Sequence, residues 1–234
     1  MIRRLFTDIA DGYDRLNRIL SLGRDASWRR RAAAFAGGSP ERIVDLACGT
    51  GDLTLALARR FPAATLVGID LTPAMLALAR RKCTAPRFSF REGDAQRLDL
   101  PADSADLVTC AFGFRNFPDP AAALRECRRI LRPGGELVVL EFFRPRSRLL
   151  GAATRAWLVL ASRLFCARHA DAYRHLRDSI ATTLGETEFV ALAEAAGLVA
   201  DGRRFFIPCC TLLRLTASPV RRRDGGQGGE GPAR

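Results

Sequence analysis

The amino-acid sequence predicts an α/β fold built on a doubly wound, mostly parallel sheet. Between residues 42 and 142, short β-rich runs alternate with helical runs, which is typical of parallel strands joined by crossover helices. A Gly-x-Gly turn follows the first of these runs, and acidic residues recur where the predicted strands end. The 234 residues, of which 48% are hydrophobic, suffice for one large domain with a sizeable core.

Five strands and three helices are expected in this central part of the chain. The strands cover residues 43–47, 65–70, 87–91, 105–111 and 136–142, and the helices cover residues 51–60, 72–81 and 119–131. The second helix begins with Thr72 as its N-cap and Pro73 in its first position, which favours helix initiation. The third helix stops at Pro133-Gly134-Gly135.

The rest of the chain predicts three further helices and then two further strands. The helices cover residues 148–167, 170–183 and 187–196, and the strands cover residues 198–206 and 209–216. Gly197 ends the last helix. The tight connection between the two strands favours an antiparallel pair at the edge of the sheet. From Arg221 onward the chain has almost no apolar side chains, which predicts a disordered tail.

The net charge of +12 is unevenly distributed, and 36 of the 37 basic residues are Arg, with Lys82 as the exception. Residues 1–40 carry +4 and residues 142–180 carry +6, whereas residues 41–141 carry only +1. This distribution suits either an anionic membrane surface or a nucleic acid. The near-neutral centre and the lack of an aromatic and basic stripe weigh against RNA, so we expect no nucleic-acid partner.

The motif content also disfavours several classes of protein. No stretch of 18 apolar residues occurs and no apolar segment follows Met1, so we expect neither a membrane-spanning helix nor a signal peptide, and a cytoplasmic location. The seven Cys are odd in number and form no Cys-x-x-Cys pair. We therefore expect buried thiols, with no metal site and no disulfide framework.

A glycine-containing turn, Asp45-Leu-Ala-Cys-Gly49-Thr50-Gly51, follows the first strand and opens a helix. Its glycines let the backbone approach a ligand closely. Thr54 stands where a dinucleotide fingerprint has its third glycine, which disfavours a dehydrogenase, and the absence of Gly-Lys-Ser/Thr excludes a P-loop. The alternative is an ordinary strand-to-helix turn.

Three carboxylates, Asp45, Asp70 and Asp94, stand at the ends of three successive strands. Asp70 lies 21 residues after Gly49, where a carboxylate can accept both hydroxyls of a ribose, and Asp94 is placed to meet an adenine edge. These charges would repel a pyrophosphate, whereas S-adenosylmethionine carries a sulfonium, an ammonium and no phosphate. The set predicts S-adenosylmethionine as co-substrate; alternatively, these residues are caps and turn residues.

At these residues the sequence resembles the ubiquinone/menaquinone biosynthesis C-methyltransferases, within the class I methyltransferase superfamily. The resemblance runs from about Phe6 to Gly197 and is most specific in two places. Residues 6–23, with the Trp-Arg pair at 28–29, resemble the family's N-terminal signature, and residues 112–117 are similar to its Phe-Gly-x-Arg-Asn block. Its other motifs correspond to residues 45–53, 131–135, 140–142 and 173–180.

This resemblance implies a seven-stranded sheet and methyl transfer from S-adenosylmethionine to a ring carbon of a polyprenylated hydroquinone. The acceptor would be a demethylmenaquinol or a 6-methoxybenzoquinol with a long prenyl tail. The cofactor contacts that it carries over fall on Thr50, Asp70, Asp94 and Ala95, with Gly49 and Gly51 shaping the loop. The chain departs from the family at His175, where Tyr is usual, and in residues 149–168 and 205–211.

This interpretation divides the chain into five parts. They are an N-terminal helical lid (1–40), the S-adenosylmethionine-binding core (41–147), a helical insertion facing substrate and membrane (148–185), the last helix with the edge strands (186–220) and the tail (221–234).

Methyl transfer to a ring carbon requires that a neighbouring hydroxyl lose its proton, because the ionised oxygen makes that carbon nucleophilic. A phenol has a pKa near ~10, so the protein must favour this ionisation. Arg115 is the leading candidate to stabilise the phenolate. Asn116 could hydrogen-bond the other ring oxygen, and Tyr13 could close the site.

Alternatives exist for these assignments. Arg115 could instead pair at the surface with an acid such as Asp119. The two His, His169 and His175, could act as bases, but a partly exposed helical position is the more typical role. At the level of function, the alternatives are a methyltransferase of another phenolic or aromatic molecule and a non-catalytic basic binding module on the same fold.

Residues 148–165 have the pattern of an amphipathic helix. Apolar side chains occupy one side, and Arg148, Arg155 and Arg163 occupy the other. Such a helix could lie on the inner face of the cytoplasmic membrane, with its Arg toward the headgroups. The alternative is a helix whose apolar face packs on the sheet. The chain could also form a homodimer.

Overall fold

The computed structural model describes most of the chain. The described residues are 2–145, 147–149, 151–153, 156, 159–160, 175, 178–180, 182–207 and 210–218. The helices expected over 148–167 and 170–183 lie largely outside these residues, and the tail over 221–234 lies wholly outside them.

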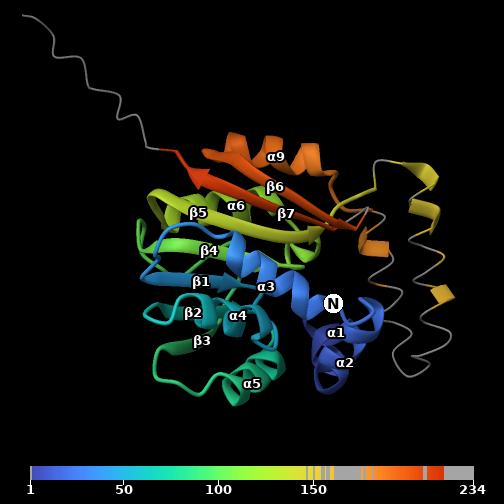
Figure 1. Cartoon of the computed structure of the whole chain (residues 1–234), viewed down its shortest axis with the longest axis horizontal. Coiled ribbons are helices and arrows are strands. Elements are labelled where there is room, and N and C mark those ends of the chain that lie inside the picture. Colours follow the sequence, from blue (N-terminus) through green and yellow to red (C-terminus); the bar gives the residue numbers. More distant parts are fainter. Residues whose placement is uncertain are drawn as a thin grey trace, which may run out of the picture.

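A seven-stranded sheet with strand order β3-β2-β1-β4-β5-β7-β6 forms the centre of the molecule (Figure 1). Its strands are β1 (Arg42–Leu46), β2 (Thr65–Asp70), β3 (Phe88–Glu92), β4 (Ala105–Ala111), β5 (Leu131–Phe142), β6 (Leu198–Ile207) and β7 (Cys210–Ala217). The first five strands are parallel, and β7 pairs antiparallel with both β5 and β6. The predicted doubly wound sheet and its antiparallel edge pair are therefore confirmed.

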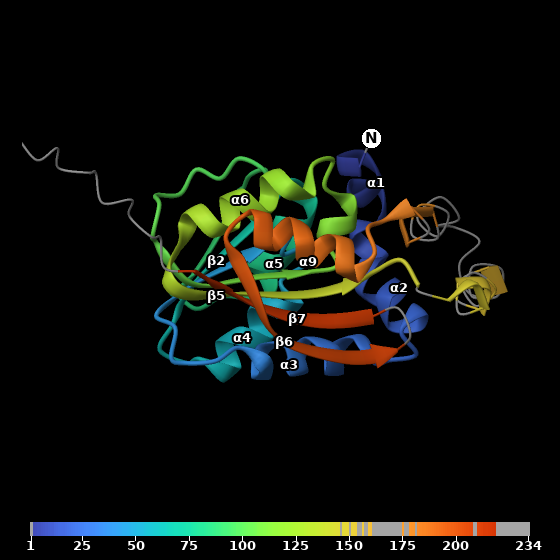
Figure 2. The same ribbon diagram turned by 90° about the horizontal axis from the view of Figure 1, so that it is seen from above.

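Helices cover both faces of this sheet (Figure 2). One face carries α3 (Asp25–Phe35) and α4 (Asp52–Arg60), and the other carries α6 (Pro120–Ile130) and α9 (Glu186–Ala195). Each layer has its own apolar core: Trp28 and Leu57 pack on the first face, and Leu124 and Phe189 on the second. Because the central strands are covered on both sides, most residues of β1 and β4 are buried.

The N-terminal helices lie at the carboxyl ends of the parallel strands (Figure 1). They are α1 (Ile2–Ile9), the 3₁₀ turn η1 (Ala10–Gly12) and α2 (Tyr13–Leu20). Ile9 and Leu16 pack with Met75 of α5 (Pro73–Lys82) in a small separate core. This packing holds the N-terminal helices over the end of the sheet where α/β proteins bind ligands.

One boundary differs from the prediction. Helix α6 ends at Ile130, one residue before its predicted end, and β5 begins directly at Leu131 and not at Glu136. Leu131 pairs with Ala105 and Glu136 pairs with Leu107, so the four residues between them bulge out of the ladder. Gly134, with a φ of +77°, makes this excursion possible, and Pro133 is tolerated because it lies in the bulge.

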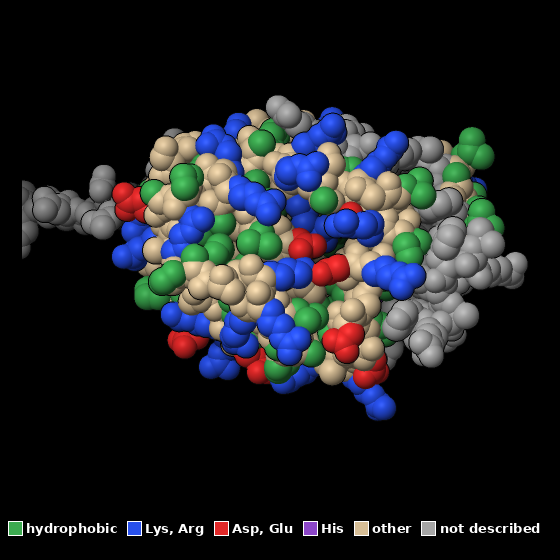
Figure 3. All heavy atoms as spheres, turned by 60° about the horizontal axis from the view of Figure 1, so that its bottom comes forward, with side chains coloured by type: hydrophobic (Ala, Val, Ile, Leu, Met, Phe, Trp, Pro, Cys, Tyr) green, Lys and Arg blue, Asp and Glu red, His purple; other side chains and the backbone are tan. Residues whose placement is uncertain are grey.

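The prediction of buried thiols is confirmed where the structure describes them. Five free thiols are buried: Cys48, Cys83, Cys110, Cys127 and Cys210. Within the described ranges, no cluster of His, Cys, Asp and Glu could hold a metal ion, and no helix is long and apolar enough to span a bilayer. Figure 3 shows Lys and Arg spread among other side chains on one face of the molecule, without a single basic stripe.

Candidate active site

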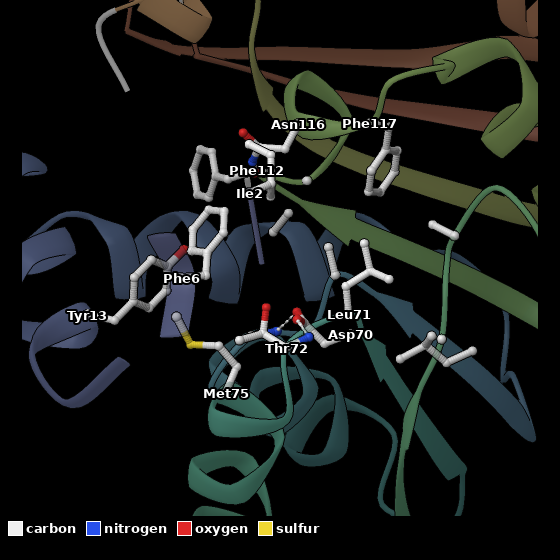
Figure 4. Close-up of a pocket in the computed structure, with 17 residues that line it drawn as sticks. Ile2, Phe6, Tyr13, Asp70, Leu71, Thr72, Met75, Phe112, Asn116 and Phe117 are labelled. Carbon is white, nitrogen blue, oxygen red and sulfur yellow. Dashed lines mark hydrogen bonds between the residues drawn. The ribbon is translucent and has the colours of Figure 1, made fainter. Parts of the chain in front are cut away.

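A cleft of about 640 Å³, its open mouth included, lies at the carboxyl ends of the parallel strands. The loops after β1, β2, β3 and β4 line it, together with Ile2, Phe6 and Tyr13 of the N-terminal helices (Figure 4). This is the point where the strand order reverses, between β1 and β4, which is where open α/β sheets bind their ligands.

The wall formed by β1 and β2 is organised around the Asp70 carboxylate. One of its oxygens accepts a hydrogen bond from the Gly49 N–H at 2.9 Å, and the other accepts from the Thr72 N–H at 2.9 Å. Gly49 has a φ of +54°, a conformation that brings its N–H toward Asp70 at little steric cost. Burial raises the pKa of Asp70, because desolvation disfavours the charged form. The predicted spacing of 21 residues thus corresponds to a direct contact.

Asp45 lies below the cleft, in the core. It is 1% exposed, and its two carboxylate oxygens accept hydrogen bonds from the Thr54 hydroxyl at 2.6 Å and the Thr109 hydroxyl at 2.7 Å. The structure therefore places this carboxylate under the glycine turn, where it ties β1 to α4 and β4. Burial raises the pKa of Asp45 to about 6, with the two hydroxyls acting in the opposite direction.

Asp45 should leave a signature in the pH dependence of stability. Between its ordinary pKa of 3.8 and the folded value of about 6, the folded chain holds this proton more tightly than the unfolded chain. The contribution of Asp45 to the free energy of unfolding should therefore fall as pH rises through this window, and be constant above it. We expect Asp45→Asn to remove that decrease. Urea denaturation of both proteins from pH 4 to 7 checks it; parallel curves would contradict it.

The other predicted cofactor residues fall in two groups. Ala95 lines the cleft, and Asp94 beside it turns its carboxylate to the Gln96 backbone and side chain. Thr50 and Gly51 lie at the start of α4, outside the cleft lining, and Gly51 is the left-handed N-cap of that helix.

Thr50 belongs to a polar cluster that residue spacing did not suggest. Its hydroxyl donates to Asp14 of α2 at 2.6 Å. The Lys82 ammonium donates to Asp14 at 2.5 Å, to Asp52 at 2.7 Å and to Thr50 at 2.9 Å. These four residues join the N-terminal helices to the glycine turn. The one signal in the sequence was that Lys82 is the single lysine of the chain.

The opposite wall is a strained loop after β4. Phe112 has a φ of +61°, which is costly for a bulky side chain, and its carbonyl accepts hydrogen bonds from the Arg115 guanidinium at 2.7 Å and the Asn116 amide at 3.3 Å. The Phe112 N–H donates to Leu140 of β5 at 2.7 Å. Strain in a loop so fully hydrogen-bonded is typical of functional sites.

Arg115 is buried against the sheet, with a side chain only 8% exposed. Its guanidinium donates to the Glu141 carboxylate at 2.7 Å and lies 5.8 Å from the ring centres of both Phe112 and Phe142. The surface pair with Asp119 is wrong: that residue caps α6 by accepting from Ala122 and pairs with Arg125. Glu141 was missed because it lies 26 residues away, on β5.

Asn116 lines the cleft on the side away from Asp70, whereas Tyr13 lines it beside Met75 (Figure 4). Asn116 meets the His175 ring, with 2.9 Å between Asn116 Oδ1 and His175 Nε2. The Tyr13 ring packs edge-on against Phe6 at 6.0 Å, and Phe6 packs edge-on against His175 at 6.5 Å. Burial and the positive charge of Arg115 lower the pKa of His175, which favours the neutral form of its ring.

The sequence is similar to a family of methyltransferases over most of its length. The model of the ubiE/COQ5 methyltransferase family matches residues 1–205. A demethylmenaquinone methyltransferase of Deinococcus radiodurans is 48% identical over 185 residues, which cover 76% of this chain and 77% of the relative. The demethylmenaquinone methyltransferase of Thermus thermophilus is 46% identical over 200 residues, which cover 82% of this chain and 90% of the relative.

Solved structures share the architecture. A methyltransferase of Haloferax volcanii, determined with the Trm112 methyltransferase activator, matches with a TM-score of 0.68 at 20% identity. The match covers 92% of this chain and 98% of the other chain. At this identity the likeness bears on the fold alone.

Proposed function

The chain belongs to the ubiE/COQ5 methyltransferase family and is an S-adenosylmethionine-dependent methyltransferase, and we propose from this premise that it methylates a ring carbon of demethylmenaquinol. The observation that carries the proposal is a cleft with two chemically different walls. One wall presents the Asp70 carboxylate, and the other presents the Phe112 ring and the Asn116 amide (Figure 4). A nucleoside suits the first wall and an apolar ring with polar oxygens suits the second.

S-adenosylmethionine fits the Asp70 wall. The N–H groups of Gly49 and Thr72 hold the Asp70 carboxylate, and each of its oxygens keeps a further lone pair that can accept a ribose hydroxyl. Ile69 and Ala95 add apolar surface beside Asp70, on which an adenine ring can pack. When bound, the sulfonium supplies the methyl group. The protein holds the methyl carbon and the ring carbon in position and keeps water away from them.

The reaction balances with the release of one proton. The ring carbon forms a bond to the methyl carbon while the methyl–sulfur bond breaks, and the sulfur keeps that electron pair. Loss of the ring hydrogen as a proton then restores aromaticity. Such a displacement depends on holding the two reacting atoms in line and on keeping water away, which the N-terminal helices over the cleft favour.

Arg115 supports ionisation of the ring hydroxyl through its charge. Its Nε–H is buried and has no hydrogen-bond partner within the described structure. A buried donor left unpaired costs about 1–3 kcal/mol. Arg115 does not line the cleft itself: its guanidinium and the Asn116 amide both donate to the Phe112 carbonyl, so its charge would act on the ring hydroxyl from behind this wall. Since Glu141 holds the other side of the guanidinium, Arg115 would act from a fixed position.

The direct test is methyl transfer from labelled S-adenosylmethionine by the purified protein. We expect transfer to demethylmenaquinol, with less to a 6-methoxybenzoquinol and none to bulk RNA. Preference for the benzoquinol would move the chain to the ubiquinone branch of the family. Transfer to RNA alone would overturn the proposal.

The end of the molecule that carries the cleft also fits a membrane surface, where a polyprenyl tail resides. Leu22, after α2, is 67% exposed, and Leu149 and Leu160 are 79% and 49% exposed. These leucines and the exposed Arg148 belong to segments at the same end of the molecule (Figures 1 and 2). Exposed apolar side chains beside Arg are the pattern of an interfacial surface.

Vesicle co-sedimentation tests this membrane contact. We expect the protein to bind anionic vesicles more than neutral ones, and 1 M salt to weaken binding because screening then shortens to ~3 Å. Leu22→Glu/Leu149→Glu should lower binding at least tenfold, since a buried Leu contributes about 1.5–3 kcal/mol.

The matched control is Val199→Glu, because Val199 is 51% exposed but pairs with Thr216 at the opposite end of the sheet. Equal loss in both variants, or equal binding to both vesicle types, would contradict the contact. A variant ending at Val220 lacks residues 221–234, so its binding shows how much of the vesicle affinity comes from the arginines of that tail.

A further inference from the structure

His175 joins three parts of the chain at the rim of the cleft. Its ring contacts Asn116, 59 residues earlier in the sequence, and packs edge-on against Phe6 of α1. Asn116 and Phe6 both line the cleft. His175 therefore stands directly behind two side chains that the substrate would meet, although it does not line the cleft itself.

The hydrogen bonds of Asn116 determine which way its amide points. Its Nδ2 lies 3.3 Å from the Phe112 carbonyl oxygen, which can only accept, so this nitrogen is the donor. Its Oδ1 then faces His175 Nε2 at 2.9 Å, and Nε2 must carry a proton to donate to it. The amide oxygen is thus hydrogen-bonded to His175, outside the cleft. One Nδ2 hydrogen is donated to Phe112, and the second remains for a ligand.

We infer that His175 is a positioning residue for the methyl transfer: its Nε2–H holds the Asn116 oxygen and so keeps an N–H donor directed at the ring oxygen of the substrate. The inference rests on the proposed function. A donor at this oxygen stabilises the phenolate, whereas a flipped amide would present its own oxygen and repel it. Fixed donors aimed at developing negative charge are a large contribution to catalysis.

This role does not depend on the charge of the imidazole. Protonation adds a hydrogen at Nδ1 and leaves the Nε2–H in place, so the contact with Asn116 survives. The charged groups that act on His175 are Arg115, which lowers its pKa, and Asp178, which raises it. A proton acceptor would behave differently, because it must lose activity on protonation.

Two substitutions separate these roles. His175→Gln keeps a nitrogen donor near the position of Nε2 but cannot titrate, and His175→Leu removes the donor. We expect His175→Leu to lower kcat about tenfold or more, with the calorimetric affinity for S-adenosylmethionine unchanged. We expect His175→Gln to restore most of that loss and to keep the pH profile of the wild type.

Each outcome has a meaning. If His175→Gln is as impaired as His175→Leu, His175 acts as the proton acceptor and the positioning role is wrong. If His175→Leu is fully active, the contact with Asn116 has no catalytic effect. Inactivity of the wild type toward every quinol would instead refute the proposed function.

A measurement without substrate tests the contact itself. The chain has two His, so His169→Gln leaves His175 as the single imidazole for ¹⁵N NMR. We expect the neutral ring to be protonated at Nε2, and Asn116→Ala to perturb that nitrogen. A neutral ring protonated at Nδ1 would overturn the inference whether or not the quinol is methylated.

Discussion

Removal of the Arg115 guanidinium is expected to lower turnover by at least a hundredfold with little change in the affinity for S-adenosylmethionine. The reason is that a fixed positive charge near the ring hydroxyl favours the phenolate, and loss of one such stabilising group costs about 10²–10³ in rate. Single-turnover transfer of labelled methyl groups measures this step. Raising the pH should partly restore the rate of the variant, because more of the substrate is then ionised.

Stability must be separated from catalysis here, since Arg115 also neutralises Glu141. The Glu141 side chain is 1% exposed, and an unpaired buried charge destabilises a fold by about 3–5 kcal/mol. We expect Arg115→Met alone to be unstable and Arg115→Met/Glu141→Gln to recover most of that stability, because the Gln oxygen can still accept from the Phe142 N–H. The double variant should remain inactive. Recovery of both stability and turnover would show that Arg115 is only structural.

Asp70→Ala is expected to weaken S-adenosylmethionine binding at least tenfold. A carboxylate that accepts ribose hydroxyls contributes roughly 1.5–3 kcal/mol per charged hydrogen bond, and Asp70 also holds the Gly49 and Thr72 N–H groups in place. Isothermal calorimetry measures the affinity, and thermal unfolding checks that the variant is folded.

The matched control for this experiment is Glu92→Gln. Glu92 is the register partner of Asp70 on the neighbouring strand, but its carboxylate pairs with Arg3 on the surface. Its loss should leave the affinity unchanged. Equal affinity of Asp70→Ala and the wild type would place the nucleoside elsewhere, and binding of NAD by the wild type would refute the class of co-substrate.

The sheet was predictable because β1, β2 and β4 are largely apolar, mostly buried runs, each with a helix after it. The contact between Gly49 and Asp70 was predictable for a related reason, since both stand at carboxyl ends of neighbouring strands, whose order follows from topology. Asp45 was harder to place. It lies inside β1, and the carboxylate is accommodated there because the Thr54 and Thr109 hydroxyls each donate to one of its oxygens.

The contacts across the cleft could not be read from spacing. Asp119 is closer to Arg115 in sequence than Glu141, but a residue before Pro120 at the start of a helix is committed to capping it. The pairing of Asn116 with His175 depends on how a distant segment returns to the cleft, which no local pattern encodes. Residue types were therefore identified more reliably than their partners.

Lys82 is the one exception to the arginine bias of this chain, and its contacts explain why. Arginine occupies 36 of the 37 basic positions, yet the position that joins α2 to the glycine turn is lysine. An ammonium directs three hydrogens from one atom toward three converging oxygens, whereas a guanidinium spreads its donors in a plane over three nitrogens. An exchange to arginine would preserve the charge but lose this geometry, so arginine is a poor replacement at this one basic position.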